Sequence, residues 1–326
     1  MAGSTIFARL RTGIPRNEMG PLMPGDAAPA YAIAVTGSVA IVMAFLFTSF
    51  SLATPIPAQL GLVAGILMST GIIARRYRLG RLDTLLEGLG LIGLMSLLCQ
   101  LGSILLCASP MPLADPWLAK ADAAIGFDWF AMIGFLQVND GVLAAAEYLY
   151  HALTWQPGLV VLLLFATRQD ARCRIFLTAW GIALAITLAI WPLVPAISTF
   201  PYYGVEPTAL PHMVGRLPWA VRGVIEPIRA GTLRAIDVEH FIGLISFPSF
   251  HAGGATLLGW AMLRTRWLWL PFALLNLGVT ASALVDGSHY LVDLIAGVAV
   301  AAVSIILAIR ITARRSTRLA VPALTA

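Results

Sequence analysis

Long runs of apolar residues alternate with shorter polar connections along most of this chain. Eight of these runs are close to the roughly 20 residues that a helix needs to cross a bilayer. They cover residues 31–51, 57–75, 85–108, 141–167, 174–196, 247–263, 267–285 and 288–310. The pattern predicts an all-α, polytopic membrane helix bundle with about eight transmembrane spans.

The composition supports this prediction. The chain has 326 residues, of which 59% are hydrophobic and 11% are charged, whereas soluble domains contain roughly 25% charged residues. We therefore expect a single transmembrane domain over residues 31–311. It lies between an N-terminal segment, 1–30, and a C-terminal tail, 312–326.

The distribution of positive charge predicts an orientation. Sixteen of the 21 Lys and Arg residues lie in the two terminal segments and in alternate connections. Connections rich in Lys and Arg stay in the cytoplasm, so both termini are predicted to be cytoplasmic. The formal net charge of +5 reflects this topology, and we predict no nucleic-acid partner from it.

Two connections on the predicted extracytoplasmic side are long enough to fold. Residues 109–140 carry apolar residues at roughly helical spacing, and acidic residues stand between them. The apolar positions are Leu113, Trp117, Leu118, Ala121 and Ile125, and the acidic ones include Asp115 and Asp122. This spacing predicts a helix in the membrane interface that covers one side of the bundle. The second connection, 197–246, is rich in proline and aromatic residues and becomes helix-like from about residue 219.

Two short polar motifs at the edges of predicted spans each contain a histidine. The first is Ser246-Phe247-Pro248-Ser249-Phe250-His251, and the second is Asp286-Gly287-Ser288-His289-Tyr290-Leu291-Val292-Asp293. Polar residues in such positions are costly and usually functional. The alternating topology puts the starts of the sixth and eighth spans on the same extracytoplasmic surface. Gly253 and Gly254 would let the helices approach closely, so the two histidines are predicted to converge.

The spacing of His289 and Asp293 indicates a chemical pair. In a helix that begins near Ser288, residues four apart share one face. The carboxylate could accept a hydrogen bond from one imidazole nitrogen and leave the other lone pair exposed, as in an oriented nucleophile or base. The positive end of this helix would favour an anion beside His289. The alternative is a buried structural contact without chemistry.

At these residues the chain resembles the type 2 phosphatidic acid phosphatase superfamily. The later motifs of that family are Pro-Ser-Gly-His and Ser-Arg-x5-His-x3-Asp, and here they read Pro248-Ser249-Phe250-His251 and Ser282-Ala283-x5-His289-x3-Asp293. The forms Phe-Pro-Ser-Phe-His and His-Tyr-x-x-Asp are most similar to the branch of inositol phosphorylceramide synthases and bacterial relatives. Two features depart from the family. Ala283 stands where many members have a phosphate-binding arginine, and a clear Lys-x6-Arg-Pro first motif is missing.

The resemblance implies a six-helix phosphatase-like core with added interfacial helices. It also implies phosphoryl transfer through a phosphohistidine, in which His289 attacks phosphorus and Asp293 orients it. His251 would protonate the leaving oxygen and then activate an acceptor, with Ser249 helping to bind the phosphoryl group. The implied substrate is a membrane lipid phosphate or phosphodiester, and the acceptor is water or an alcohol. No cofactor or metal is implied, and the implied location is a bacterial inner membrane with an extracytoplasmic site.

The loss of arginine at position 283 requires positive charge from elsewhere. Arg229 and Arg234 precede the first histidine motif on the predicted extracytoplasmic side, and guanidinium groups suit phosphate. We assign Arg229 first, Arg234 second and Arg222 third as phosphate-binding candidates. The alternative is that these arginines contact lipid head groups or nearby acidic residues.

Glu147 and His151 are also four residues apart, in the outer part of the fourth predicted span. They could line a pocket for an acceptor or head group, or form a structural hydrogen bond between helices. A function of a different class also stays open. A transporter or lipid-binding protein could retain this scaffold without turnover, as the absent arginine at Ala283 would allow.

Overall fold

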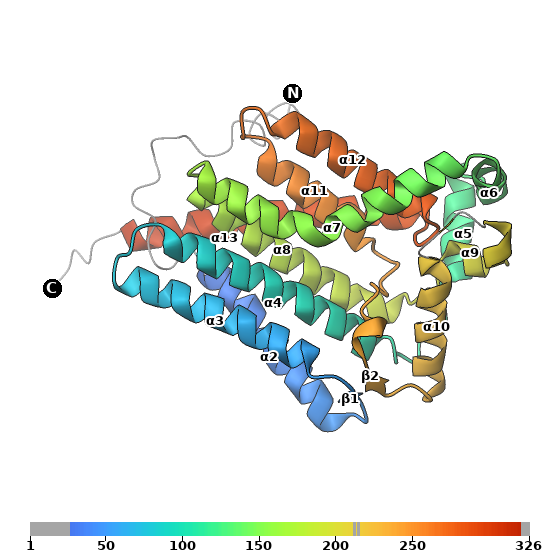
Figure 1. Cartoon of the computed structure of the whole chain (residues 1–326), viewed down its shortest axis with the longest axis horizontal. Coiled ribbons are helices and arrows are strands. Elements are labelled where there is room, and N and C mark those ends of the chain that lie inside the picture. The colour runs from blue at the N-terminus through green and yellow to red at the C-terminus, as the bar shows by residue number, and fades with distance from the viewer. Residues whose placement is uncertain (1–26, 211–212, 214–215, 321–326) are drawn as a thin grey trace.

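The structure is a computed structural model of the chain (Figure 1). It describes residues 27–320 apart from 211–212 and 214–215. Residues 1–26 of the predicted N-terminal segment and residues 321–326 of the predicted tail lie outside the described part.

All eight predicted apolar stretches form helices. They are α2 (Ala28–Phe47), α3 (Ile56–Arg76), α4 (Leu82–Leu106), α7 (Asp140–Ala166), α8 (Asp170–Ile190), α11 (Phe250–Met262), α12 (Trp269–Val285) and α13 (Leu291–Ala320). Within the described residues, six helices are long and apolar enough to cross a membrane, and α11 and α12 are shorter. The 13 residues of α11 give a length of about 20 Å at 1.5 Å per residue. The structure is therefore an all-α membrane bundle in which α11 and α12 make a short hairpin.

Helix α8 lies at the centre of the bundle. It packs against α2, α4, α7, α11 and α13, and two thirds of its apolar window is buried. Its large side chains Phe176 and Trp180 are almost completely enclosed. Their packing supplies a rigid base for α11, because Trp180 meets the ring of Phe250 edge-on at 5.1 Å between centroids.

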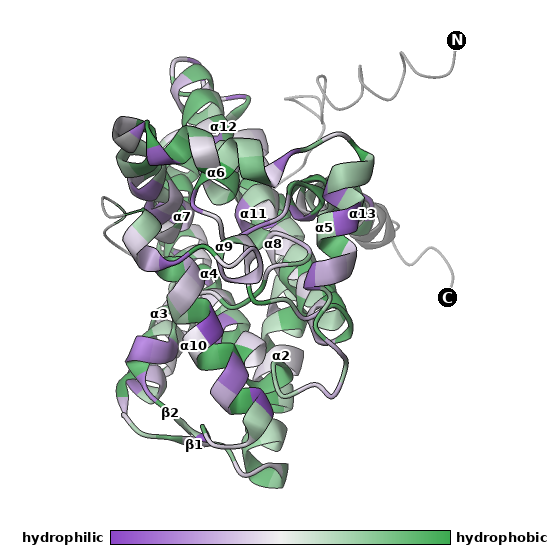
Figure 2. Ribbon diagram, turned by 90° about the vertical axis from the view of Figure 1, so that its right-hand side faces the viewer, coloured by the Kyte–Doolittle hydropathy of each residue, from purple (hydrophilic) through white to green (hydrophobic). Residues whose placement is uncertain are grey.

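Short elements cover the end of the bundle at which α11 and α13 begin. Figures 1 and 2 place α5 (Asp115–Ala124), α6 (Trp129–Gln137), α9 (Thr199–Tyr202) and α10 (Leu217–Ala230) at this end. The predicted helix near residue 219 is α10, whose apolar face is buried. Strand β1 (Ser51–Leu52) pairs in parallel with β2 (Ala235–Ile236), with Ser51 opposite Ala235. This pairing ties the long connection to the end of α2.

The predicted helix in residues 109–140 differs from the structure. The segment forms two helices, α5 and α6, which are separated at Gly126, where the backbone has a positive φ of 85°. Trp117 and Ile125 are more than half exposed, whereas Asp115 and Asp122 are at most 1% exposed. The acidic side of α5 therefore faces the interior, because Asp122 accepts hydrogen bonds from the start of α13 and Asp115 accepts from Tyr290 and Ile197.

Candidate active site

The two motif histidines lie side by side. His251 is the second residue of α11, and His289 lies two residues before α13. Their ring centroids are 5.6 Å apart, with the planes inclined at 57°. Residues that are distant in sequence are thus brought together at one end of the bundle, as the topology predicts.

The close contact between α11 and α13 fixes this separation. The Ser249 N–H donates to the Asp293 carbonyl over 3.0 Å, and the Ser249 hydroxyl caps α11 by accepting from the Ala252 N–H. A Cβ atom on Gly297 would lie 2.1 Å from the Ser249 carbonyl oxygen. Only glycine fits at position 297, so the sequence sets how closely the two histidine-bearing helices approach.

The environment of His289 assigns its two ring nitrogens. Nδ1 lies 3.0 Å from the Ser246 carbonyl oxygen. A carbonyl can only accept, so Nδ1 carries the proton and Nε2 keeps its lone pair. The side chain is 2% exposed, which holds the ring in one orientation. His289 thus has the tautomer that a nucleophile requires.

Asp293 supports His289 in a different way from the predicted one. The helix begins at Leu291 rather than near Ser288, and Asp293 Oδ2 is 3.8 Å from Nδ1, which is within ion-pair range but too long for a hydrogen bond. Oδ2 instead accepts from the Ser246 hydroxyl at 2.6 Å and from the Tyr290 N–H at 2.9 Å. Asp293 is therefore placed to stabilise a positive charge on the ring, while Ser246 orients it.

The first turn of α13 is capped from α5. Asp122 accepts from the backbone N–H groups of Leu291 and Val292, each at 2.9 Å, and from the indole of Trp129 at 2.8 Å. The predicted anion site at this helix terminus is therefore wrong, because a carboxylate already occupies these donors. The first N–H groups of α11 beside His251 have no intrahelical acceptors.

A second carboxylate from α5 anchors the residue after His289. Asp115 accepts from the Tyr290 hydroxyl at 3.0 Å and from the Ile197 N–H at 3.1 Å. Burial raises the pKa of Asp115 to about 6. The cap by Asp122 and the anchor at Asp115 make α5 a support for the histidine motif.

The other face of His251 packs on α7. The ring of Tyr150 stacks on the His251 ring at 3.8 Å between centroids and 24° between planes. Ser288 donates to Asp286, and burial, together with the nearby Glu147, raises the pKa of Asp286 to about 7. The carboxyl groups of Asp286 and Glu147 therefore lie on the α7 side of the histidine pair.

Glu147 and His151 lie at the edge of this site. Glu147 is half-buried near Asp286, and His151 is exposed, with its ring 6.0 Å from that of Tyr150. The structural alternative applies to their neighbour Gln156, which accepts a hydrogen bond from Asn276 of α12 at 3.0 Å. A head-group role for Glu147 and His151 stays a prediction.

The three candidate arginines each have another partner. Arg229 donates to the carbonyl oxygens of Ser109 and Met111 at 2.8 and 2.6 Å. Arg234 donates to the Ile228 carbonyl and lies over the Phe50 ring, 4.7 Å from its centroid. Arg222 pairs with Glu226 at 2.7 Å on the exposed face of α10, as the alternative reading has it. Phosphate binding by Arg229 or Arg234 stays a prediction.

Position 283 is filled by packing. Ala283 is fully buried in a cluster with Tyr150, Ala252 and Leu294. An alanine here leaves room for Tyr150, whose ring also supports His251. The departure from the family motif thus coincides with a different support for this histidine.

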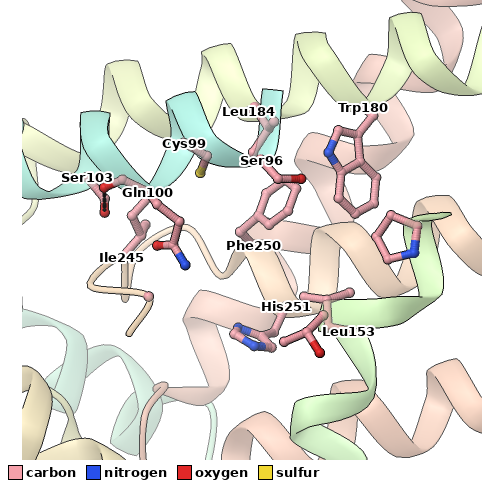
Figure 3. Close-up of a pocket in the computed structure, with 13 residues that line it drawn as sticks. Ser96, Cys99, Gln100, Ser103, Leu153, Trp180, Leu184, Ile245, Phe250 and His251 are labelled. Atoms are coloured by element: carbon pink, nitrogen blue, oxygen red, sulfur yellow. Dashed lines mark hydrogen bonds between the residues drawn. The ribbon is translucent and has the colours of Figure 1, made fainter. Parts of the chain in front are cut away.

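A cavity of about 270 Å³ adjoins His251 (Figure 3). Residues of α4, α7, α8 and α11 line it, and it also reaches the connection at Gly243 and Ile245. Leu153, Trp180 and Phe250 form much of its apolar wall. The cavity therefore reaches the histidine pair from the His251 side.

Sequence reasoning missed several residues of this site. Ser246 was part of the first motif but had no assigned role, and its contribution to His289 comes through its backbone carbonyl. Tyr150 lay beside two more conspicuous polar residues. Asp115 and Asp122 lie on the polar face of the predicted interfacial helix, and no local pattern reveals that Asp122 caps α13 or that Asp115 anchors Tyr290.

Comparison with known proteins agrees with this geometry. The model of the PAP2 superfamily matches residues 116–307, which include both histidine motifs and extend from α5 into α13. The chain belongs to the PAP2 superfamily. No curated protein and no solved structure matches the chain. The matched region begins after α2, α3 and α4, so these three helices lie outside the part that the PAP2 superfamily defines.

Proposed function

We propose that this PAP2 superfamily chain is an integral membrane phosphatase or phosphotransferase that acts on lipid-linked phosphate through a phosphohistidine. The observation that supports it best is the paired arrangement of His251 and His289, with Nδ1 of His289 donating to a carbonyl and Nε2 free. A buried nucleophile, a carboxylate behind it and a second imidazole beside it are the groups that a double displacement at phosphorus needs.

In the first step, Nε2 of His289 attacks phosphorus, and the bond from phosphorus to the leaving oxygen breaks. The imidazolium of His251 gives its proton to that oxygen. The ring of His289 becomes cationic, and Asp293 at 3.8 Å stabilises the charge. In the second step, neutral His251 takes a proton from water or an alcohol, whose oxygen attacks phosphorus as the P–N bond breaks. Both histidines then return to their initial states.

Negative charge on the phosphoryl oxygens requires donors. The free N–H groups at the start of α11 are proposed to supply part of this stabilisation, together with the predicted contribution of Arg229 or Arg234. Ser249 holds these donors in place through its cap of α11. Its place in the site is therefore to position the backbone.

The membrane side of the reaction follows from charge. Arginines cluster at the α3–α4, α7–α8 and α11–α12 connections, while α11 and α13, whose first residues adjoin the two histidines, begin at the opposite end of the bundle (Figure 1). The positive-inside rule then favours an extracytoplasmic site in a plasma membrane, the bacterial inner membrane if the chain is bacterial.

The test is release of phosphate from dioleoyl phosphatidic acid by the purified full-length chain. Replacement of His289 or His251 by alanine should lower the rate by about 10²–10⁴. Rates within about tenfold of wild type for both variants would refute the mechanism. Lipid transport that occurs without phosphate release and persists in His289→Ala would instead favour the non-catalytic alternative.

A phospholipid-to-alcohol transferase, similar to inositol phosphorylceramide synthase, is the second candidate. The cavity beside His251 favours it, because a transferase needs space for an acceptor alcohol next to the general base. Lipid mass analysis after incubation with phospholipid and candidate alcohols separates transfer from hydrolysis.

A further inference from the structure

Polar side chains of α4 face the cavity beside His251. Ser96, Gln100 and Ser103 line it at helical spacing, although α4 is one of the membrane-spanning helices. Polar residues in such a helix are rare without a partner or a function. Figure 3 shows Gln100 and His251 entering the same space from opposite sides. Among the described residues, no hydrogen bond uses the side-chain amide of Gln100.

The chemistry of this lining suits an uncharged group. Apart from His251 and the Cys99 thiol, the residues that line the cavity are not ionisable. Hydroxyl and amide groups would pair with a neutral hydroxyl, whereas a phosphate placed among them would have no compensating charge other than that of His251. The cavity therefore fits the alcohol side of the reaction.

An apolar groove lies next to this cavity. The groove has a volume of about 360 Å³ and lies between α2, α4 and α8. Cys99 and Leu184 line both spaces, so the groove and the cavity adjoin at these two side chains. Its walls include Ile33, Met95 and Leu98. Such a combination fits a molecule with one polar end and a hydrocarbon chain.

We propose that the cavity and the groove together bind a lipid alcohol, with its hydroxyl beside His251 and its chain between α2, α4 and α8. The proposal rests on the proposed phosphoryl transfer for its chemistry. When the lipid phosphate is cleaved, this alcohol is the leaving group and receives the proton of His251. In transfer, a lipid alcohol in the same place gives its proton to His251 as its oxygen attacks phosphorus.

This subsite uses a part of the chain outside the family match. The groove lies largely on α2 and α4, which precede residue 116. The catalytic histidines belong to the matched region. The N-terminal helices thus supply selectivity for the lipid, and Gln100 is the residue that recognises the hydroxyl.

The first experiment measures binding directly. An oleyl alcohol with a diazirine in its chain is photolysed with the purified full-length chain in detergent micelles, and labelled peptides are mapped by mass spectrometry. Labelling should fall on α2, α4 and α8, and unlabelled oleyl alcohol should compete at least about tenfold better than oleyl methyl ether, which lacks the donor hydroxyl. Gln100→Met, which keeps the volume, should remove that preference. Labelling elsewhere, or equal competition by both compounds, overturns the proposal.

The second experiment fills the groove. Ala185 of α8 is exposed in the groove, whereas Ala189, one turn further along, is exposed outside it. Ala185→Trp should raise KM for dioleoyl phosphatidic acid about tenfold and leave kcat within about twofold, and Ala189→Trp should change neither. An unchanged KM in Ala185→Trp, or equal loss in both variants, contradicts the subsite.

The two experiments separate this inference from the proposed function. The proposed function fails if wild type releases no phosphate, or if the release does not depend on His289. The photolabelling still decides whether the lipid-alcohol subsite exists.

Discussion

Substitution of Gly297 by alanine tests how the histidine spacing is set. The added Cβ would lie 2.1 Å from the Ser249 carbonyl oxygen, whereas ordinary contacts begin at about 3.4 Å. Helices α11 and α13 would therefore have to separate by about 1.3 Å. A misplacement of about 1 Å can cost about 10²-fold in rate. We expect Gly297→Ala to lower kcat by about that factor.

The assay is the initial rate of phosphate release from dioleoyl phosphatidic acid, with thermal unfolding in detergent measured on the same sample. The matched control is Gly259→Ala in α11, where the nearest atom to the added Cβ would be 3.9 Å away. This control should keep its rate, because the added Cβ meets no close atom. It should not lose stability, since alanine improves helix propensity by up to about 1 kcal/mol. Gly297→Ala with a rate within threefold of wild type would refute the reasoning.

Three further predictions concern the support of the site. Asp122→Asn should lower the free energy of unfolding by about 1.5–3 kcal/mol and reduce activity, since Asn keeps only one of the two oxygens that accept from Leu291 and Val292. Thermal unfolding checks this against Asp128→Asn, which should be neutral because a single oxygen of Asp128 caps α6 and Asn retains it. The pKa of Asp286 rises from about 4 to about 7 on folding, so its proton stabilises the fold at low pH and the contribution is lost as pH rises to 7. The free energy of unfolding of wild type should therefore fall by up to about 4 kcal/mol between pH 4 and 8 through this group. Thermal unfolding of Asp286→Asn should depend less on pH than that of wild type. An equal pH dependence in the two proteins would contradict this expectation. Arg229→Ala should lower the midpoint of thermal unfolding, because two carbonyl groups lose their donor, while Arg222→Ala should not. A tenfold rise in the KM of Arg229→Ala would also support phosphate binding by Arg229, and an unchanged KM would contradict it.

The hydrophobic pattern was sufficient to predict the bundle. Each apolar stretch became a helix because its backbone hydrogen bonds must be satisfied internally in lipid. The exact start of a helix was harder to predict. α13 begins at Leu291 because Asp122, from a distant segment, caps it there. The position of His289 outside the helix follows from this tertiary contact.

The orientation of α5 shows a similar limit. Amphipathic spacing assigns apolar residues to the buried face, yet Trp117 is exposed and Asp122 is buried. Hydrogen bonds to the N–H groups of α13 offset the burial of this carboxylate. Local sequence carries no information about a partner that is so far away along the chain.

The convergence of His251 and His289 was predictable, because two motifs on the same side of a bundle can meet across small residues. Gly253 does contact Gly297 at this crossing, as its added Cβ would lie 3.1 Å from the Gly297 carbonyl oxygen. The link between His289 and Ser246 was not predictable, since a backbone carbonyl has no sequence signature.

Trapping the covalent intermediate tests the central claim most directly. The purified chain is mixed briefly with ³²P-labelled phosphatidic acid, quenched in alkali and digested for peptide mapping. We expect acid-labile phosphate on His289 in wild type and none in His289→Ala. Turnover without phosphate on His289, or phosphate on another residue in the His289→Ala variant, would contradict it.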